Sequence, residues 1–435
     1  MRVLVRVLVL VRVLVLVPWE VGMGRGQKLD PPGIPGDDRG RGMARFFESI
    51  VVGLIAASGC GGSMVPLDSA VVSYDRKTAD SMSKLLLLNI ARARHNQPMH
   101  FTGISSIAAT YRYTLEGGVG PAATGDLGWL VLPSFRGSAE ENPTISLGPM
   151  QGDEFTQRLL TPFEEQKLTL LLRQGYDIDA LLRLLGAEIR VDDHASGKIA
   201  VYTNRPSHAE GYTLYRRVMI HLSSIQDRHA LRVEPLHFEY VWSVPEAAVT
   251  PESFLTTYKD FSLTHDADRK TYRVSRRVNG RVMITNYDPS VLPNEELLQL
   301  HEEAAAVPAN DVVVDIRAGY PGGEMPLHGT LRLRSFHEVL TFIARGISEE
   351  PEFAVTPDPR TPSVTENPVR TLEVAESASA PNGEGPSVGL DGRHYFVRPQ
   401  RGYQWNQKAF NMLAQLFQMS VSAVPQAGPA ITISK

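Results

Sequence analysis

The sequence predicts an α+β or α/β fold in which amphipathic helices pack on a mixed sheet or sheets. Three observations lead to this prediction. Several segments repeat apolar residues at helical spacing, and short runs rich in β-branched and aromatic residues lie between them. The chain also has 435 residues, which is long enough for two or three domains. We therefore expect helices to cover one face of a sheet.

The first half of the chain contains both helical and extended patterns. Apolar residues near one face predict a helix over residues 74–96, which Gln97-Pro98 ends. Extended structure is expected over residues 100–115, followed by a turn at Gly117-Gly118, turn-rich sequence over 119–143 and a short strand at 144–147. Further helices are expected at 152–160, 163–174, 177–189 and 212–227, and further strands at 199–204 and 231–242.

The second half contains the strongest hairpin signal of the chain, Asn279-Gly280. Both residues of a tight hairpin turn need positive φ, which these two types tolerate. The sequence therefore predicts a hairpin of strands 271–278 and 282–286. A helix at 294–306, strands at 312–316 and 329–334, a helix at 336–344 and a strand at 394–398 follow, and apolar residues then recur at helical spacing through Trp405, Ala409, Met412, Leu413, Leu416 and Phe417.

Composition divides this body into four segments. Residues 73–250 and 251–350 are expected to form two α/β domains. Residues 351–391 are rich in Pro, Ser, Thr, Glu and Gly, which predicts a linker or a long surface loop. Residues 392–435 are too short to keep a core of their own without disulfides or a metal. We therefore expect this strand–helix segment to pack on the preceding core.

The single cysteine, Cys60, ends a stretch that resembles a bacterial lipoprotein signal. Residues 43–59 have Arg45 near the start, an apolar middle and small residues before the cysteine. The cysteine sulfur is the nucleophile that such signals need for lipid attachment. We expect cleavage just before Cys60, lipidation of Cys60, and a lipobox made of Ala57, Ser58 and Gly59. The alternative interpretation is a short apolar core helix that ends at a Gly-Cys turn.

The segments on either side of this signal have different expected roles. Residues 1–17 repeat Val and Leu around three arginines, and a mid-span arginine costs a membrane helix roughly 2.5–3.5 kcal/mol. We expect translation to start at Met43, with residues 1–42 a low-complexity extension that is not translated or is disordered. Residues 60–72, which begin Cys-Gly-Gly-Ser, are expected to be a flexible tether.

Three runs of the body, at residues 85–102, 142–162 and 333–342, resemble a set of uncharacterised proteobacterial envelope lipoproteins that contain a lipobox. The likeness covers roughly residues 43–435. It implies a location in the cell envelope and brings no catalytic residue with it.

Two short motifs nearly match known catalytic patterns. Ser81 and Lys84 have the Ser-x-x-Lys spacing of penicillin-binding proteins, but Tyr272 stands where the third motif of those enzymes needs a glycine. Residues 151–155 read Gln-Gly-Asp-Glu-Phe, one residue away from the motif of nucleotide cyclases. Its two acids are better explained as the first turn of a helix, where the helix dipole favours negative charge.

Neither a metal nor a cofactor is expected. His301-Glu302 and His337-Glu338 each lack the second histidine that a His-Glu-x-x-His zinc helix requires. Six arginines are candidate contacts for anionic lipid or glycan, although exposed arginines are usually solvated: Arg92, Arg94, Arg216, Arg217, Arg276 and Arg277. Catalytic residues remain unknown.

These observations lead to a functional hypothesis. We expect a lipid-anchored bacterial envelope protein that acts as a binding or assembly module, and the alternative left open is a cell-wall hydrolase or peptidase. The expected partners are the membrane, through acyl chains on Cys60, and an envelope protein or glycan. A net charge of -4 provides no basic field for nucleic acid. Because Gly61 stands where an inner-membrane retention signal has Asp, the outer membrane is favoured, with the body in the periplasm.

Overall fold

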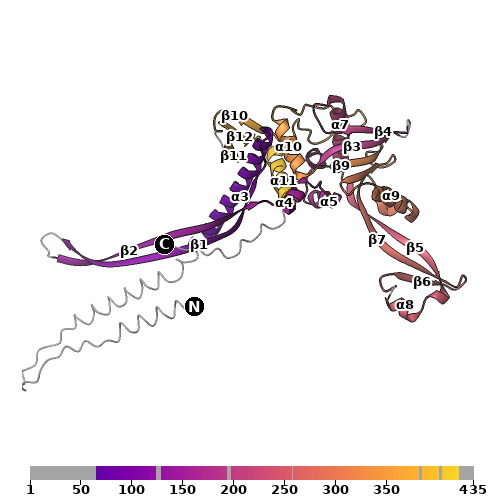
Figure 1. Ribbon diagram of the computed structural model, residues 1–435, viewed down its shortest axis with the longest axis horizontal. Coiled ribbons are helices and arrows are strands. Elements are labelled where there is room, and N and C mark those ends of the chain that lie inside the picture. The colour runs from indigo at the N-terminus through magenta and orange to yellow at the C-terminus, as the bar shows by residue number, and fades with distance from the viewer. Residues whose placement is uncertain are drawn as a thin grey trace, which may run out of the picture. The chain divides into compact units, whose positions relative to one another are not determined.

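The computed structural model describes residues 65–123, 129–193, 197–256, 258–381, 385–400 and 404–420 (Figure 1). The chain divides into two units, Met1–Val72 and Ser73–Lys435. Helix α3 (Val65–Arg94) begins in the first unit, and the other described elements belong to the second. Cys60 and its lipobox lie outside the described residues, as do the expected extension 1–42 and signal 43–59.

The α+β fold class predicted from the sequence is confirmed, because helices pack on a sheet with both parallel and antiparallel pairs. The seven-stranded main sheet has the order β4-β3-β9-β8-β7-β5, with β6 paired to β7. Strands β7 and β8 are parallel, and the other neighbours are antiparallel. The strands are β3 (Gly186–Asp193), β4 (Lys198–Thr203), β5 (Arg232–Pro245), β6 (Ser262–Asp266), β7 (Thr271–Thr285), β8 (Asp311–Ile316) and β9 (Leu327–Leu333).

This sheet draws strands from both sides of the domain boundary expected near residue 250. Strands β3, β4 and β5 precede that residue and β6 to β9 follow it. Strand β3 is hydrogen-bonded to β9, so neighbours in the sheet come from opposite sides of the boundary. The segments 73–250 and 251–350 therefore share one sheet.

Helices cover both faces of the central strand β8, and its side chains alternate between two cores as a strand requires. Val312 and Val314 belong to the main core, whereas Val313 belongs to a second cluster. Helix α9 (Asn294–Ala306) lies between β7 and β8 in the chain (Figure 1). It supplies Leu297 and Leu300 to the second cluster. The main core is formed with α6 (Ile178–Leu185), α7 (Ala209–Asp227), α10 (Phe336–Gly346) and α11 (Trp405–Ser420).

The other described elements form two smaller sheets and several short helices. Two smaller sheets are the β1 (Phe101–Ala123) and β2 (Trp129–Met150) pair, and the group β10 (Val374–Ser377), β12 (Arg393–Val397) and β11 (Ser387–Leu390). Short helices are α4 (Asp153–Leu160), α5 (Glu165–Arg173) and α8 (Pro251–Thr256), with single 3-10 turns η2 (Glu246–Ala248) and η3 (Pro289–Val291).

The turn expected at Gly117-Gly118 is wrong. Both glycines lie inside β1, where Gly117 pairs with Phe135 and Gly118 with Ser134. Strand β2 also runs through most of the segment that we expected to be turn-rich. Glycine adopts the extended backbone of a strand as well as the backbone of a turn. Here pairing with the distant strand β2 selects the extended conformation.

The hairpin expected at Asn279-Gly280 is also wrong. Strand β7 continues through both residues, and Asn279 pairs with His237 of β5 beside a bulge. A Cβ at Gly280 would lie 3.0 Å from Phe238 Cε1 and 3.1 Å from His301 Nδ1. Glycine is therefore required here by the close approach of neighbouring side chains.

The helix expected over 177–189 ends earlier, at Leu185, and β3 begins at Gly186. The Tyr215 hydroxyl donates a hydrogen bond to the Leu182 carbonyl, at 2.7 Å. A Cβ at Gly186 would lie 2.0 Å from that hydroxyl oxygen. The Tyr215 hydroxyl of α7 thus leaves no space for a side chain at residue 186, where α6 ends and β3 begins.

The Pro-rich segment and the tail both contact the main body. Glu352 and Thr371 of the segment expected to be a linker or loop are buried, and β10 and β11 also come from this segment. Trp405, Leu413 and Phe417 of α11 are buried in the main core. Burial of each such large apolar side chain contributes roughly 1.5–3 kcal/mol.

Candidate functional site

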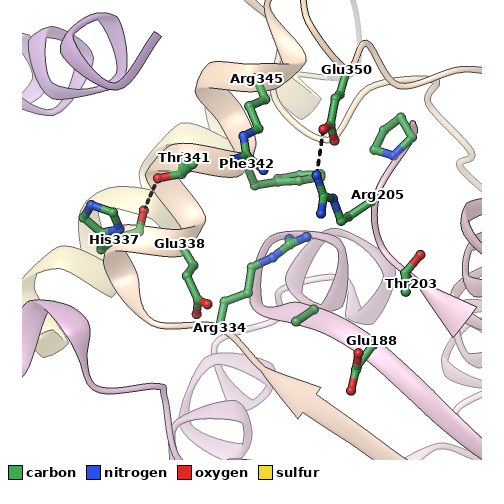
Figure 2. A pocket seen from close by; sticks show the side chains of 12 residues that line it. Glu188, Thr203, Arg205, Arg334, His337, Glu338, Thr341, Phe342, Arg345 and Glu350 are labelled. Carbon is green, nitrogen blue, oxygen red and sulfur yellow. Dashed lines mark hydrogen bonds and ion pairs between the residues drawn. The ribbon is translucent and has the colours of Figure 1, made fainter. Parts of the chain in front are cut away.

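A cavity of about 390 Å³ lies between the start of β3, the end of β4 and helix α10 (Figure 2). Three arginines line it, namely Arg205, Arg334 and Arg345. Figure 2 shows their side chains pointing toward the ring of Phe342 from three sides. We call this cavity the arginine pocket.

The position of Arg334 follows from the sequence around it. Arg334 directly follows β9 and precedes Ser335, the N-cap of α10. Ser335 and Glu338 form a capping box, in which each side chain accepts a hydrogen bond from the other residue's main-chain N–H. The Arg334 N–H also donates to the Leu185 carbonyl, at 2.6 Å. The main chain at Arg334 is therefore held from both sides.

The Arg334 guanidinium is bound by main-chain oxygens. It donates to the carbonyls of Arg183 and Leu184, each at 3.1 Å, and of Asn204 at 2.8 Å. The first two belong to the last turn of α6, whose carbonyls have no partner within the helix. The guanidinium carbon also lies 4.0 Å from the centroid of the Phe342 ring. One role of Arg334 is thus to cap α6.

The charge of Arg334 is buried, and nearby groups that include Glu338 and Glu352 offset that burial only in part. The residue is only 6% exposed. Burial lowers the pKa of its side chain to about 10. Within the described ranges Arg334 forms no ion pair, and its partners are the neutral carbonyls named above. A negative charge placed beside this guanidinium would offset the cost of burying it.

The carboxylates of the pocket already have partners. Glu350 pairs with Arg205 at 3.0 Å, and Glu188 pairs with Arg190 at 2.7 Å. Glu338 Oε2 accepts the N–H of Ser335 at 2.7 Å. Arg345 is exposed and forms no ion pair in the described part of the chain, but it lies near Glu350, where it acts with Arg205 to lower the pKa of that carboxyl.

This arrangement favours an anionic ligand. Arg334 and Arg345 both line the cavity, and in the described part of the chain neither forms an ion pair with a carboxylate. Guanidinium groups bind carboxylates and phosphates through paired N–H donors. The described residues include no cluster of His, Cys, Asp and Glu suited to a metal ion.

A second cavity, of about 460 Å³, lies at the carboxyl end of β8, beside α9 and the start of β9. Ligands commonly bind at such strand ends in open sheets. His328 lies here between two carboxylates, with Nδ1 3.2 Å from Asp315 Oδ1 and Nε2 2.7 Å from Glu303 Oε1. These hydrogen bonds raise the pKa of His328 to about 10. The imidazole is therefore protonated at neutral pH and is a poor general base.

The groups around His328 are held in single protonation states as well. Asp315 accepts hydrogen bonds from the Tyr287 hydroxyl and Arg317 Nε, both at 2.6 Å. Burial alone would raise the pKa of Asp315, but the hydrogen bonds it accepts outweigh burial and lower it. Burial and the bond to Asp315 raise the pKa of Tyr287. The hydrogen bonds of this cluster connect α9 to β8 and β9. Groups held in one protonation state are poorly suited to proton transfer, so we assign the cluster a structural role.

A third cavity, of about 560 Å³, lies between the start of α6, the end of α7 and helix α11. Asp177 lines it, and burial raises the pKa of its carboxyl to about 6. That carboxylate accepts the N–H of Asp179 at 2.8 Å and so caps α6. Helix capping is thus sufficient to explain its position.

The residues singled out in the sequence are dispersed in the structure. Lys84 pairs with Asp80 at 2.7 Å on α3, the same helix as Ser81. His301 lies against the Phe238 ring, with centroids 4.4 Å apart. Arg216, considered as a surface contact, is instead buried and pairs with Asp179 at 2.5 Å.

Other sequence patterns agree with their positions. The acids Asp153 and Glu154 lie in the first turn of α4, as expected. His337 and Glu338 line the arginine pocket. The sequence did not identify Arg334 as a site residue. The sequence feature that could have indicated it is its position directly before Ser335, where the capping box begins. Arg205 and Arg345 had no comparable signal.

Comparison with protein-family models, curated proteins and solved structures found no match. In the described ranges, every helix is too short or too polar to cross a membrane.

Proposed function

We propose that this chain is a lipid-anchored envelope protein whose globular unit is a binding module, with the arginine pocket as its site for a carboxylate or phosphate group. The proposed location rests on residues 43–60, which read as an export signal ending in a lipobox cysteine. The proposed ligand class rests on Arg334.

Arg334 is the observation on which the ligand class depends. A buried guanidinium with a lowered pKa gains more from a nearby anion than an exposed one, since charges interact more strongly away from water. Arg345, at the exposed side of the pocket, adds a second guanidinium. The hydrolase alternative is less favoured, because His328 of the second cavity is held protonated by Asp315 and Glu303 and is a poor general base.

The test uses Arg345, because Arg334 also caps α6 and its loss would unfold that region. Calorimetric titration of the full-length chain with inorganic phosphate and with acetate measures the affinity. Arg345→Glu is expected to weaken binding of the better probe by about tenfold or more, equivalent to about 1.4 kcal/mol. Arg76→Glu makes the same charge change at an exposed site on α3 and should have no effect. Unchanged affinity in Arg345→Glu, or binding of neither probe, would refute the anion site.

The anchor is tested separately. Cys60→Ala, expressed from Met43, is expected to remain unlabelled when cells receive a radiolabelled fatty acid, because the attachment atom is gone. Fractionation should find the wild-type chain with the outer membrane. Equal labelling of the two proteins would rule out lipidation at Cys60.

A further inference from the structure

Strand β5 forms one edge of the main sheet, and among the described strands it pairs with β7 alone. Figure 1 shows the distal parts of β5 and β7, with β6, extending away from the rest of the sheet. Two sets of hydrogen bonds show which main-chain groups of β5 face outward. The Asn294 side chain accepts from the Glu239 N–H at 2.7 Å and donates to the Glu239 carbonyl at 2.8 Å. On the inner side, the Glu246 N–H donates to the Lys270 carbonyl at 3.0 Å.

The open part of this edge is short and is bounded at both ends. Because main-chain groups alternate between the two sides of a strand, Val241, Ser243 and Pro245 face outward as Glu239 does. Among the described residues, the main-chain groups of Val241 and Ser243 have no partner. At one end the groups of Glu239 are already bound by Asn294. At the other end Pro245 has no N–H to offer.

Three consecutive large apolar side chains are exposed along this open stretch. Tyr240, Val241 and Trp242 are 43%, 40% and 39% exposed. Tyr240 and Trp242 point to one face of the strand and Val241 to the other. Residues 240–244 include no charged residue that would protect the edge. Unpaired main-chain groups beside β-branched and aromatic side chains are a template for another strand.

A second copy of β5 matches this stretch in register and in length. In an antiparallel pair with Trp242 opposite its own counterpart, Val241 lies opposite Ser243 of the other copy, and Ser243 opposite Val241. These outward-facing residues then exchange their N–H···O=C bonds. The two blocked residues, Glu239 and Pro245, also lie opposite each other, so no group that is already bound has to be released. Two-fold symmetry repeats each contact.

We propose that two copies of the protein associate through β5 and join their sheets across a two-fold axis at Trp242. Side chains approach closely in pairs that do not exchange hydrogen bonds. The two Trp242 rings would therefore meet, and Tyr240 would cover Val244 of the other copy. The inference is independent of the arginine pocket and of the lipid anchor. So short a strand pair is a small interface, and the test therefore traps it covalently.

The experiment uses disulfide formation in membranes from cells that express the full-length chain. The Cα atoms of a pair that does not exchange hydrogen bonds are about 4.5 Å apart, which a disulfide can bridge. After mild oxidation, Trp242→Cys is expected to give a product of twice the chain mass on a non-reducing gel. Wild type, whose single cysteine is Cys60, is the blank. Val201→Cys, at an exposed position on β4, controls for random collision.

A second pair of variants keeps Trp242, which also packs on the Phe261 ring with centroids 5.4 Å apart. Tyr240→Cys and Val244→Cys should form the product when they are expressed together. Neither should form it alone, because equivalent residues of the two copies are then offset by about 13 Å along the strands. Adding Ser243→Pro, which removes an outward N–H, should lower the yield of the mixed pair about tenfold. Ser243→Ala keeps that N–H and should leave the yield unchanged.

Product from Trp242→Cys, or from the mixed pair alone if the Trp242 ring is itself required, would support the two-fold pairing. Yields at the level of wild type in both would overturn it. The register would be wrong if Tyr240→Cys alone gave as much product as the mixed pair. Equal yields with Ser243→Pro and Ser243→Ala would show that the main-chain bonds are not made. A product of any other mass would mean a different partner and would refute association with a second copy.

Discussion

Arg183 and Glu352 form an ion pair 3.0 Å long that lies inside the protein, although 169 positions separate them in the chain. Their side chains are 0% and 7% exposed. Arg183 belongs to α6, and Glu352 belongs to the segment that the composition marked as a linker or loop. The pair therefore fastens that segment to the body. Glu352 also accepts hydrogen bonds from the Thr371 N–H and hydroxyl, at 2.6 and 2.7 Å.

Glu352→Ala is expected to lower the free energy of unfolding by about 3–5 kcal/mol, because it leaves the buried Arg183 without this partner. Urea denaturation followed by circular dichroism measures the change. Glu302→Ala removes an exposed acid of α9 and should cost no more than about 0.5 kcal/mol. Equal stability of the two variants would show that the ion pair contributes little.

Trypsin should leave the Arg370-Thr371 bond intact in the native wild-type protein. The Thr371 N–H is bound by Glu352, so cleavage there requires the segment to detach first. In Glu352→Ala we expect cleavage at this bond, detected by mass spectrometry of brief digests. The fragments should still elute together in gel filtration, because α11 remains in the main core. Rapid cleavage of wild type at Arg370 would contradict this attachment.

His328 should make stability depend on pH in the alkaline range. Its hydrogen bonds to Asp315 and Glu303 raise its pKa from 6.5 to about 10 in the folded protein. Its stabilising effect is therefore complete below about pH 6.5 and is lost as the pH rises toward 10. Thermal melting at pH 6 and at pH 9.5 should show a larger drop for wild type than for His328→Gln. His229→Gln, at an exposed position, should behave as wild type.

Gly280→Ala is expected to lower the free energy of unfolding by about 1–3 kcal/mol, because the added methyl group meets Phe238 and His301. Gly346→Ala is the matched control in α10, where nothing lies within 4 Å of the added atom. That substitution should stabilise by up to about 1 kcal/mol through helix propensity. Chemical denaturation compares the two. A neutral Gly280→Ala would mean that strand β7 shifts without cost.

Local patterns were sufficient wherever an element is determined by its own residues. The apolar spacing over 294–306 predicted α9 with the bounds that the structure has. The start of α10 at Phe336 follows from the Ser335 capping box, and the apolar face of α11 predicted burial of Trp405, Leu413 and Phe417. Helical hydrogen bonds and caps join residues a few positions apart, so a short window of sequence contains the physical cause.

Tertiary contacts decided the rest. Gly117-Gly118 and Asn279-Gly280 have turn-forming composition, but pairing with β2 and β5 keeps both in strands. Arg334 faces a pocket because the last turn of α6, about 150 positions earlier, receives its guanidinium. The sequence by itself determined the fold class and marked Cys60 as the expected anchor. The order of strands in the main sheet and the convergence of Arg205, Arg334 and Arg345 on one pocket depend on contacts between distant segments. The free energy of such contacts exceeds local conformational preference and leaves no local pattern in the sequence.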